Sequence, residues 1–222
     1  GSGTRLWPMS RTKFPKQFNE FFSESLQSAT LRRLSSFGRP WVLTSETLRA
    51  ITTKLAKADG LEIERCLYEP IPKNTAPAIA YLCHVLAQEG RDNEIVGIFP
   101  ADHLIGDENV FKDAIRKAIE VAKTGRLVTL GLEPTEPATG YGYIQVATNF
   151  GKNGEADVLK FHEKPDIKTA AQFLEQGGFY WNAGIFIFKV DVMIQHFAKH
   201  APQIWNLVSS VNRDFSNLKP IF

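Results

Sequence analysis

The feature that most constrains the fold is an alternation of short apolar strands and amphipathic helices between residues 40 and 131. Residues 40–44, 61–67, 95–100 and 126–131 have strand character, and the intervening segments 45–58, 74–89 and 107–124 repeat apolar residues with helical spacing. Residues 95–100 are continuously apolar, as in strands that are covered on both faces. The alternation predicts an α/β protein with an open, mostly parallel mixed sheet flanked by helices.

The pattern changes after residue 131. Segments 140–147 and 156–163 have strand character and are separated by a polar turn at 151–154, which predicts a small antiparallel insertion. A helix at 166–176, an aromatic-rich strand at 179–189 and helical C-terminal residues follow. The chain has no internal repeat or low-complexity linker, and its 222 residues suit one large domain over 1–222.

Charge and cysteine content exclude several classes of protein. Lys and Arg number 26 against 24 Asp and Glu, a net charge of +2, which argues against broad electrostatic binding of nucleic acid. Cys66 and Cys83 fit no metal-binding spacing and are expected to be reduced, which favours the cytoplasm. No apolar run approaches ~18 residues, so we expect no membrane-spanning helix. The sequence does not distinguish a monomer from a homo-oligomer.

The N-terminal residues combine a glycine loop with two cations. The stretch Gly1-Ser2-Gly3-Thr4 lets backbone amides approach a charged group closely, and Arg5 and Lys16 add positive charge. This combination suits a polyphosphate, while a flexible tail with scattered charges is the alternative. Phosphate-binding glycine loops usually follow a strand, so we expect an upstream strand, and also a further C-terminal part, in a longer parent protein.

Ligands of open α/β sheets bind at the carboxyl ends of the strands. Asp102 follows the strand at 95–100 and is a candidate ligand for Mg²⁺, with a turn or cap role as the alternative. Glu69 follows the strand at 61–67 and has the acceptor oxygens needed to read the N1–H and 2-amino groups of guanine. Asn74 and Thr75 begin the next helix, where nucleotide binding competes with simple helix capping.

A second set of polar residues lies in the later strands. Gly142 lets a backbone approach a ligand closely, although a tight strand entry is the alternative. Pro165 is expected to end the strand at 156–163. With the strand ended there, Glu163 can accept sugar hydroxyl protons and Lys164 can hold a phosphate.

Asn182 offers an amide for a hydroxyl group, although residues 181–184 also suit a core aromatic followed by a turn. The chain shows no catalytic triad and no zinc spacing. Cations, a few carboxylates, glycines and amides suit a reaction in which the substrate supplies its own nucleophile and the protein positions it and neutralises charge.

Six blocks, in this order along nearly the whole chain, resemble the sugar-nucleotide pyrophosphorylase family, and specifically its mannose-1-phosphate guanylyltransferase branch. They are Gly1-Ser2-Gly3-Thr4-Arg5-Leu6-Trp7-Pro8 with Pro15-Lys16-Gln17-Phe18, Asn74-Thr75-Ala76-Pro77-Ala78, Pro100-Ala101-Asp102-His103, Thr139-Gly140-Tyr141-Gly142-Tyr143-Ile144, Phe161-His162-Glu163-Lys164-Pro165 and Trp181-Asn182-Ala183-Gly184. The resemblance implies a Rossmann-like nucleotidyltransferase fold. It also implies a reaction in which GTP and mannose 1-phosphate give GDP-mannose and pyrophosphate, with Mg²⁺.

The resemblance assigns roles to most of the candidate residues. On the nucleotide side, the glycine loop holds the phosphates, Arg5 neutralises the leaving pyrophosphate, Lys16 binds near the α-phosphate and Asp102 binds Mg²⁺. On the sugar side, Lys164 orients the sugar phosphate, and Glu163, Asn182 and the Gly142 backbone hold the sugar. A second metal-binding Asp is expected beyond the end of this chain. His162 stands where the family usually has Val, which predicts a polar group near the sugar-phosphate site. Two alternatives remain: the same chemistry with another sugar 1-phosphate or nucleotide, and a non-catalytic nucleotide-sugar-binding regulatory homologue.

Overall fold

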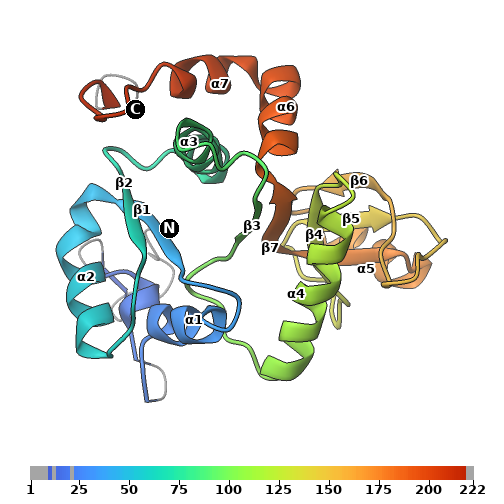
Figure 1. Ribbon diagram of the computed structural model, residues 1–222. Coiled ribbons are helices and arrows are strands. Elements are labelled where there is room, and N and C mark those ends of the chain that lie inside the picture. The colour runs from blue at the N-terminus through green and yellow to red at the C-terminus, as the bar shows by residue number, and fades with distance from the viewer. Residues whose placement is uncertain (1–9, 12–13, 21–22, 219–222) are drawn as a thin grey trace. The chain divides into compact units, whose positions relative to one another are not determined.

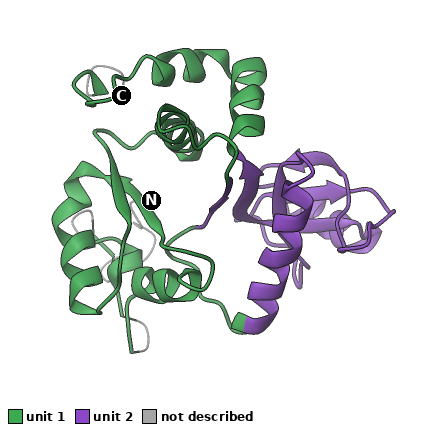
Figure 2. Ribbon diagram, in the orientation of Figure 1, with its two compact units in different colours: residues 1–94, 100–108, 190–222 green, residues 95–99, 109–189 purple. Residues whose placement is uncertain are grey.

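A computed structural model describes residues 10–11, 14–20 and 23–218 of the chain (Figure 1). The chain divides into two compact units (Figure 2). Unit 1 comprises Gly1–Glu94, Pro100–Glu108 and Val190–Phe222, and unit 2 comprises Ile95–Phe99 and Asn109–Lys189. The assignment of residues 1–222 to one catalytic domain remains a prediction.

The strands of unit 1 form a small parallel sheet. In it, β1 (Trp41–Ser45) pairs with β2 (Arg65–Glu69), and Trp41 lies opposite Arg65. The connection runs through η3 (Glu46–Leu48) and α2 (Arg49–Ala58), as a parallel pair requires a crossover. The Ser45 hydroxyl accepts a hydrogen bond from the Thr47 amide at 3.2 Å and so caps the start of η3.

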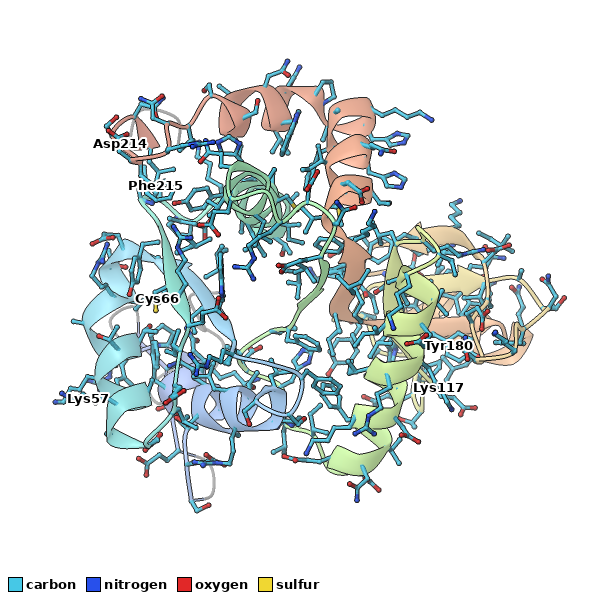
Figure 3. All side chains as sticks on the ribbon, in the orientation of Figure 1. Lys57, Cys66, Lys117, Tyr180, Asp214 and Phe215 are labelled. Atoms are coloured by element: carbon cyan, nitrogen blue, oxygen red, sulfur yellow. The ribbon has the colours of Figure 1, made fainter. Side chains whose placement is uncertain are left out.

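The remaining elements of unit 1 are helical: η2 (Lys16–Phe18), α1 (Leu26–Leu34), α3 (Thr75–Gln88), α6 (Val190–His200) and α7 (Pro202–Ser209). Helix α3 is mostly buried and packs against α6 and α7. Its His84 Nε2 lies 2.8 Å from the carbonyl oxygen of Val211, and its Tyr81 ring meets Phe215 edge-on at 6.0 Å (Phe215 is labelled in Figure 3). These contacts attach the segment after α7 to the helix predicted at 74–89.

Unit 2 is built on a five-stranded sheet. Its strands are β3 (Ile95–Ile98), β4 (Val128–Leu132), β5 (Tyr143–Val146), β6 (Val158–His162) and β7 (Phe179–Lys189). The long strand β7 pairs antiparallel with β3, β4 and β5, and β6 pairs antiparallel with β5 at an edge. The predicted antiparallel insertion is therefore confirmed as β5 and β6.

Strand directions explain why the alternating pattern predicted a mostly parallel sheet. Strands β3 and β4 are both antiparallel to β7, so they run in the same direction as each other, as the strand–helix–strand pattern requires. Within the described residues, however, only β1 and β2 pair directly in parallel. The α/β class and the mixed sheet are confirmed, and β7 supplies the antiparallel contacts.

Two amphipathic helices complete unit 2. Helix α4 (Glu108–Ala122) buries its apolar stripe, and its Phe111 ring lies 6.1 Å from that of Phe99. Helix α5 (Ile167–Gln176) is capped by Asp166, whose carboxylate accepts a hydrogen bond from the Thr169 amide at 2.8 Å. The inner face of α5 joins a core cluster of Tyr143, Ala170, Phe173 and Phe179.

Across the described part of the chain, none of the helices combines the length and the apolar character that a membrane span needs.

Candidate functional site

Five of the predicted nucleotide-site residues lie outside the described residues: Gly1, Ser2, Gly3, Thr4 and Arg5. Their roles therefore remain predictions. The other predicted residues divide between the units, with Lys16, Glu69, Asn74, Thr75 and Asp102 in unit 1 and Gly142, Glu163, Lys164 and Asn182 in unit 2.

Lys16 and Asp102 are 86 positions apart in sequence and meet in unit 1. The Lys16 ammonium donates a hydrogen bond to the Asp102 carbonyl oxygen at 3.2 Å and lies 3.5 Å from its carboxylate oxygen Oδ2. The two side chains are 35% and 44% exposed, respectively. An ion pair with this exposure contributes about 0–1 kcal/mol, so a phosphate or a cation can compete for either partner.

His103 and Arg33 lie in the same charged environment. Burial lowers the pKa of His103, the positive charges of Lys16 and Arg33 lower it further, and Asp102 opposes them. Arg33 is itself buried, and its Nε lies 3.5 Å from a carboxylate oxygen of Glu108. The neutral imidazole is therefore favoured beside Asp102.

Arg33 was missed from the sequence. Helix α1 carries Arg32 and Arg33 side by side, and both follow buried positions at helical spacing, Arg32 after Ser28 and Arg33 after Thr30, so the spacing alone does not single out Arg33. Arg32 instead forms an exposed ion pair with Glu24 at 3.0 Å. Burial in the folded chain, rather than spacing or charge, separates the two arginines.

The number of carboxylates near Asp102 bears on its predicted role as a Mg²⁺ ligand. Among the described residues, no group of three or more His, Cys, Asp or Glu side chains is arranged to hold a metal ion. Mg²⁺ in phosphoryl-transfer sites usually takes one or two carboxylates and completes its coordination with substrate phosphates and water. The single, half-exposed carboxylate of Asp102 fits that mode of binding and does not fit an all-protein cage.

The predicted base-reading residues lie around the start of α3. Glu69 ends β2, is only 7% exposed, and its Oε1 has no hydrogen-bond partner among the described residues. Burial raises the pKa of this carboxyl group, and a hydrogen bond from the Lys73 backbone opposes the shift. An unpaired buried acceptor is costly, so a bound donor would be favoured there.

Asn74 precedes α3 with a positive φ of 69°, and its side chain makes no capping hydrogen bond. The alternative that Asn74 simply caps the helix through its side chain is therefore wrong. Asn74 and Thr75 are both exposed. Their polar groups are accessible to a ligand, and their nucleotide-binding role remains a prediction.

In unit 2, the fold brings together three residues that were predicted to hold a sugar. The backbone N–H of Asn182 donates to the Gly142 carbonyl oxygen at 2.8 Å, and a Cβ atom placed on Gly142 would lie 3.3 Å from Oε2 of Glu163. The side-chain oxygen of Asn182 accepts hydrogen bonds from the Thr129 hydroxyl at 3.1 Å and from the Gly184 amide at 3.0 Å. These bonds orient the Asn182 amide and leave its NH₂ group for a ligand.

Lys164 completes this group. Strand β6 ends at His162, which confirms that the strand stops before Pro165. Lys164 then adopts a φ of 41°, unusual for a residue other than glycine, and its ammonium donates to Oε1 of Glu163 at 2.7 Å. The two oxygens of Glu163 thus face different partners, with Oε1 toward Lys164 and Oε2 toward Gly142.

The prediction that His162 adds a polar group to this site is wrong. Alternation along β6 directs the imidazole to the face covered by α5, where its ring centroid lies 4.8 Å from that of Phe173 and 5.9 Å from that of Phe179. Its Nε2 is buried without a hydrogen-bond partner among the described residues. Burial lowers the pKa of His162, and the positive charge of Lys160 adds to the shift.

The described residues form an α/β protein with cationic, acidic and amide side chains near the ends of its strands, and sequence comparison gives its class. The family model described as nucleotidyl transferase matches residues 1–218, so the chain belongs to the nucleotidyl transferase family.

Curated relatives are consistent with this class. The chain is 39% identical over 230 residues to a mannose-1-phosphate guanylyltransferase of Sinorhizobium fredii, an alignment that covers 99% of this chain and 45% of the relative. It is 41% identical over 211 residues to the alginate biosynthesis protein AlgA of Pseudomonas fluorescens, covering 93% of this chain and 43% of the relative. The chain thus spans less than half the length of these relatives.

A solved structure supports the fold. It is described as mannose-1-phosphate geranyltransferase from Thermus thermophilus and superposes with a TM-score of 0.88 at 32% identity. The superposition covers 100% of this chain and 64% of the solved one.

Proposed function

We propose that this chain transfers GMP from GTP to mannose 1-phosphate, giving GDP-mannose and pyrophosphate. Membership of the nucleotidyl transferase family and the name of the Sinorhizobium fredii relative support the choice of reaction and substrates. The observation that carries the proposal is the grouping of Glu163, Lys164 and Asn182 around Gly142 in unit 2. This group combines a cation for a phosphate with an acceptor and a donor for hydroxyl groups.

On the sugar side, the ammonium of Lys164 binds the phosphate of mannose 1-phosphate. Its present partner is Glu163, and both side chains are more than half exposed, so a phosphate dianion competes well for the ammonium. Glu163 then accepts sugar hydroxyl protons, while the NH₂ group of Asn182 donates to another hydroxyl. The Gly142 carbonyl is already bonded to Asn182, so its backbone contribution would come from the N–H.

On the nucleotide side, Lys16 binds near the α-phosphate of GTP, and Arg5 and the loop Gly1–Thr4 hold the departing phosphates. Glu69 accepts hydrogen bonds from the guanine edge, and Asn74 and Thr75 contact the nucleotide near it. The buried, unpaired Oε1 of Glu69 supports this role, because adenine has no equivalent pair of donors. Asp102 would hold Mg²⁺ together with the substrate phosphates, and the ion would supply neutralisation of phosphate charge.

The reaction needs little proton transfer by the protein. An oxygen of the sugar phosphate attacks the α-phosphorus in line, a new P–O bond forms, and the bond to the oxygen that bridges the α- and β-phosphates breaks. That attacking oxygen is already anionic at neutral pH, so no strong general base is required. The contribution of Lys16, Arg5 and Lys164 is positioning and charge neutralisation.

A reducing compartment such as the cytoplasm is part of the proposal. Both cysteines are free thiols. Cys83 is buried, which raises the pKa of its thiol to about 12, and Cys66 (labelled in Figure 3) is half-buried on β2. Thiols that remain unpaired are typical of proteins kept in reducing conditions.

The experiment is a panel of initial rates of pyrophosphate release by the full-length protein. GTP, ATP, UTP and dTTP are each combined with mannose 1-phosphate or glucose 1-phosphate. We expect GTP with mannose 1-phosphate to be the best pair. A different best pair would replace the substrates but keep the chemistry. No pyrophosphate release with any pair would favour the regulatory homologue instead.

A further inference from the structure

Two faces of the sheet in unit 2 differ in what covers them. Register places Trp181, Tyr143 and His162 on one face, which packs against α5. The neighbouring row, Tyr180, Ile144 and Phe161, lies on the opposite face (Tyr180 is labelled in Figure 3). Ile144 is buried in this row, but the ring of Phe161 is 48% exposed. An exposed aromatic side chain next to polar ligand-binding candidates can supply the apolar surface that ligand sites use.

Phe161 lies directly over Gly142. A Cβ atom on Gly142 would lie 2.6 Å from Cζ of Phe161 and 3.3 Å from Oε2 of Glu163, so the ring and the carboxylate converge on one point above the glycine. The first distance is shorter than any normal contact. The absence of a side chain at Gly142 is therefore what allows the Phe161 ring to lie beside Glu163.

We propose that Phe161 binds the sugar substrate by supplying the apolar surface on which the sugar ring packs its C–H groups. The inference rests on the proposed function, because it assumes that Glu163, Lys164 and Asn182 bind a sugar 1-phosphate. Ligand sites combine apolar and aromatic surface with a few placed polar groups, and Phe161 lies beside one of the polar candidates, Glu163. Hydroxyl groups then reach Glu163, the phosphate reaches Lys164, and the C–H face covers the exposed side of the ring.

The chain provides a matched control for this proposal. Leu159 lies two positions before Phe161 on β6, where the pairing with β5 shifts register, and it is 62% exposed. It has no part in the contacts around Gly142. Phe161→Ala and Leu159→Ala therefore remove similar exposed apolar side chains, and only the first removes the proposed sugar surface.

The test is calorimetric binding to the full-length protein, with mannose 1-phosphate and inorganic phosphate as the two probes. Phe161→Ala should weaken the binding of mannose 1-phosphate about tenfold, as expected for losing roughly 50 Å² of apolar contact. The affinity for inorganic phosphate should stay within about twofold of the wild type. Phe161→Tyr should retain most of the affinity, and Leu159→Ala should match the wild type. Unchanged mannose 1-phosphate affinity in Phe161→Ala, equal weakening of both probes, or equal effects at Leu159 would each overturn the proposal.

A double-mutant cycle adds a second measurement. Gly142→Ala should displace the Phe161 ring and weaken mannose 1-phosphate binding, and this effect should shrink when Phe161 is already Ala. Additive effects would contradict the role of the ring. If the wild type binds mannose 1-phosphate without turnover, the proposed function fails, while the binding comparison still tests the role of Phe161. If the wild type binds only glucose 1-phosphate, glucose 1-phosphate replaces mannose 1-phosphate as the probe. If it binds neither sugar phosphate, both the proposed function and the role of Phe161 are overturned.

Discussion

Lys164 allows backbone strain and charge to be tested separately. Its φ of 41° lies in the left-handed region, which costs roughly 1 kcal/mol for a residue that carries a Cβ. Asn tolerates this conformation better than most residues, so Lys164→Asn removes the charge and keeps the backbone. Lys164→Ala removes the charge and keeps the strain, while Lys164→Arg keeps the charge.

The structure sets different magnitudes for folding and for binding. The ion pair of Lys164 with Glu163 is 54% and 60% exposed, so its loss should change the free energy of unfolding by about 0–1 kcal/mol. A hydrogen bond between the ammonium and a substrate phosphate is worth about 2–3 kcal/mol, or roughly 10²-fold in the KM for mannose 1-phosphate. The variants should therefore remain folded while their KM for mannose 1-phosphate rises.

Steady-state kinetics with each substrate varied in turn, together with urea denaturation, measures both effects. We expect Lys164→Asn and Lys164→Ala to raise the KM for mannose 1-phosphate about 10²-fold and the KM for GTP less than about threefold. Lys164→Arg should keep most of the wild-type KM. Equal increases in both KM values, or a change below threefold for mannose 1-phosphate, would refute the assignment of Lys164 to the sugar phosphate.

Three further predictions test the other parts of the molecule. Arg5→Ala should slow the single-turnover rate about 10²-fold, and a change below threefold would remove Arg5 from the mechanism. Asp102→Asn should weaken Mn²⁺ binding, followed by electron paramagnetic resonance with GTP present, by more than about tenfold, and unchanged binding would place the metal elsewhere. Burial lowers the pKa of His162, so the unfolded state binds the proton more readily, and stability should fall as pH drops below the ordinary imidazole value of 6.5. His162→Leu should reduce that fall between pH 8 and pH 5 in urea denaturation, whereas identical pH profiles would contradict a lowered pKa for His162.

Element positions were predictable because burial patterns are local. The aromatic-rich strand predicted at 179–189 has the same bounds as β7, and the helix predicted at 74–89 is α3 with its ends shifted by one residue. Pairing partners were not predictable in the same way. That β7 joins both β3 and β4 depends on contacts between residues far apart in sequence, which neither periodicity nor composition records.

The same contrast between local patterns and distant contacts holds for the site residues. The rule that ligands bind at strand ends singled out Asp102 and Glu163, which follow β3 and β6 along the chain, and their roles stay predictions. The side-chain partners came only from the structure. The ion pair of Lys16 with Asp102 spans 86 positions, and the contact of Lys164 with Glu163 depends on a left-handed φ that a lysine rarely adopts.

Gly142 shows how a correct motif can carry an incomplete physical reason. A glycine beside a ligand was expected to let the ligand approach the backbone, but the space that a Cβ would occupy is already taken by Phe161 and Glu163. A substitution at Gly142 would therefore act first on the protein's own side chains and only through them on the substrate. The requirement for glycine is then a packing requirement within unit 2, and it would persist even if the sugar never touched the Gly142 backbone.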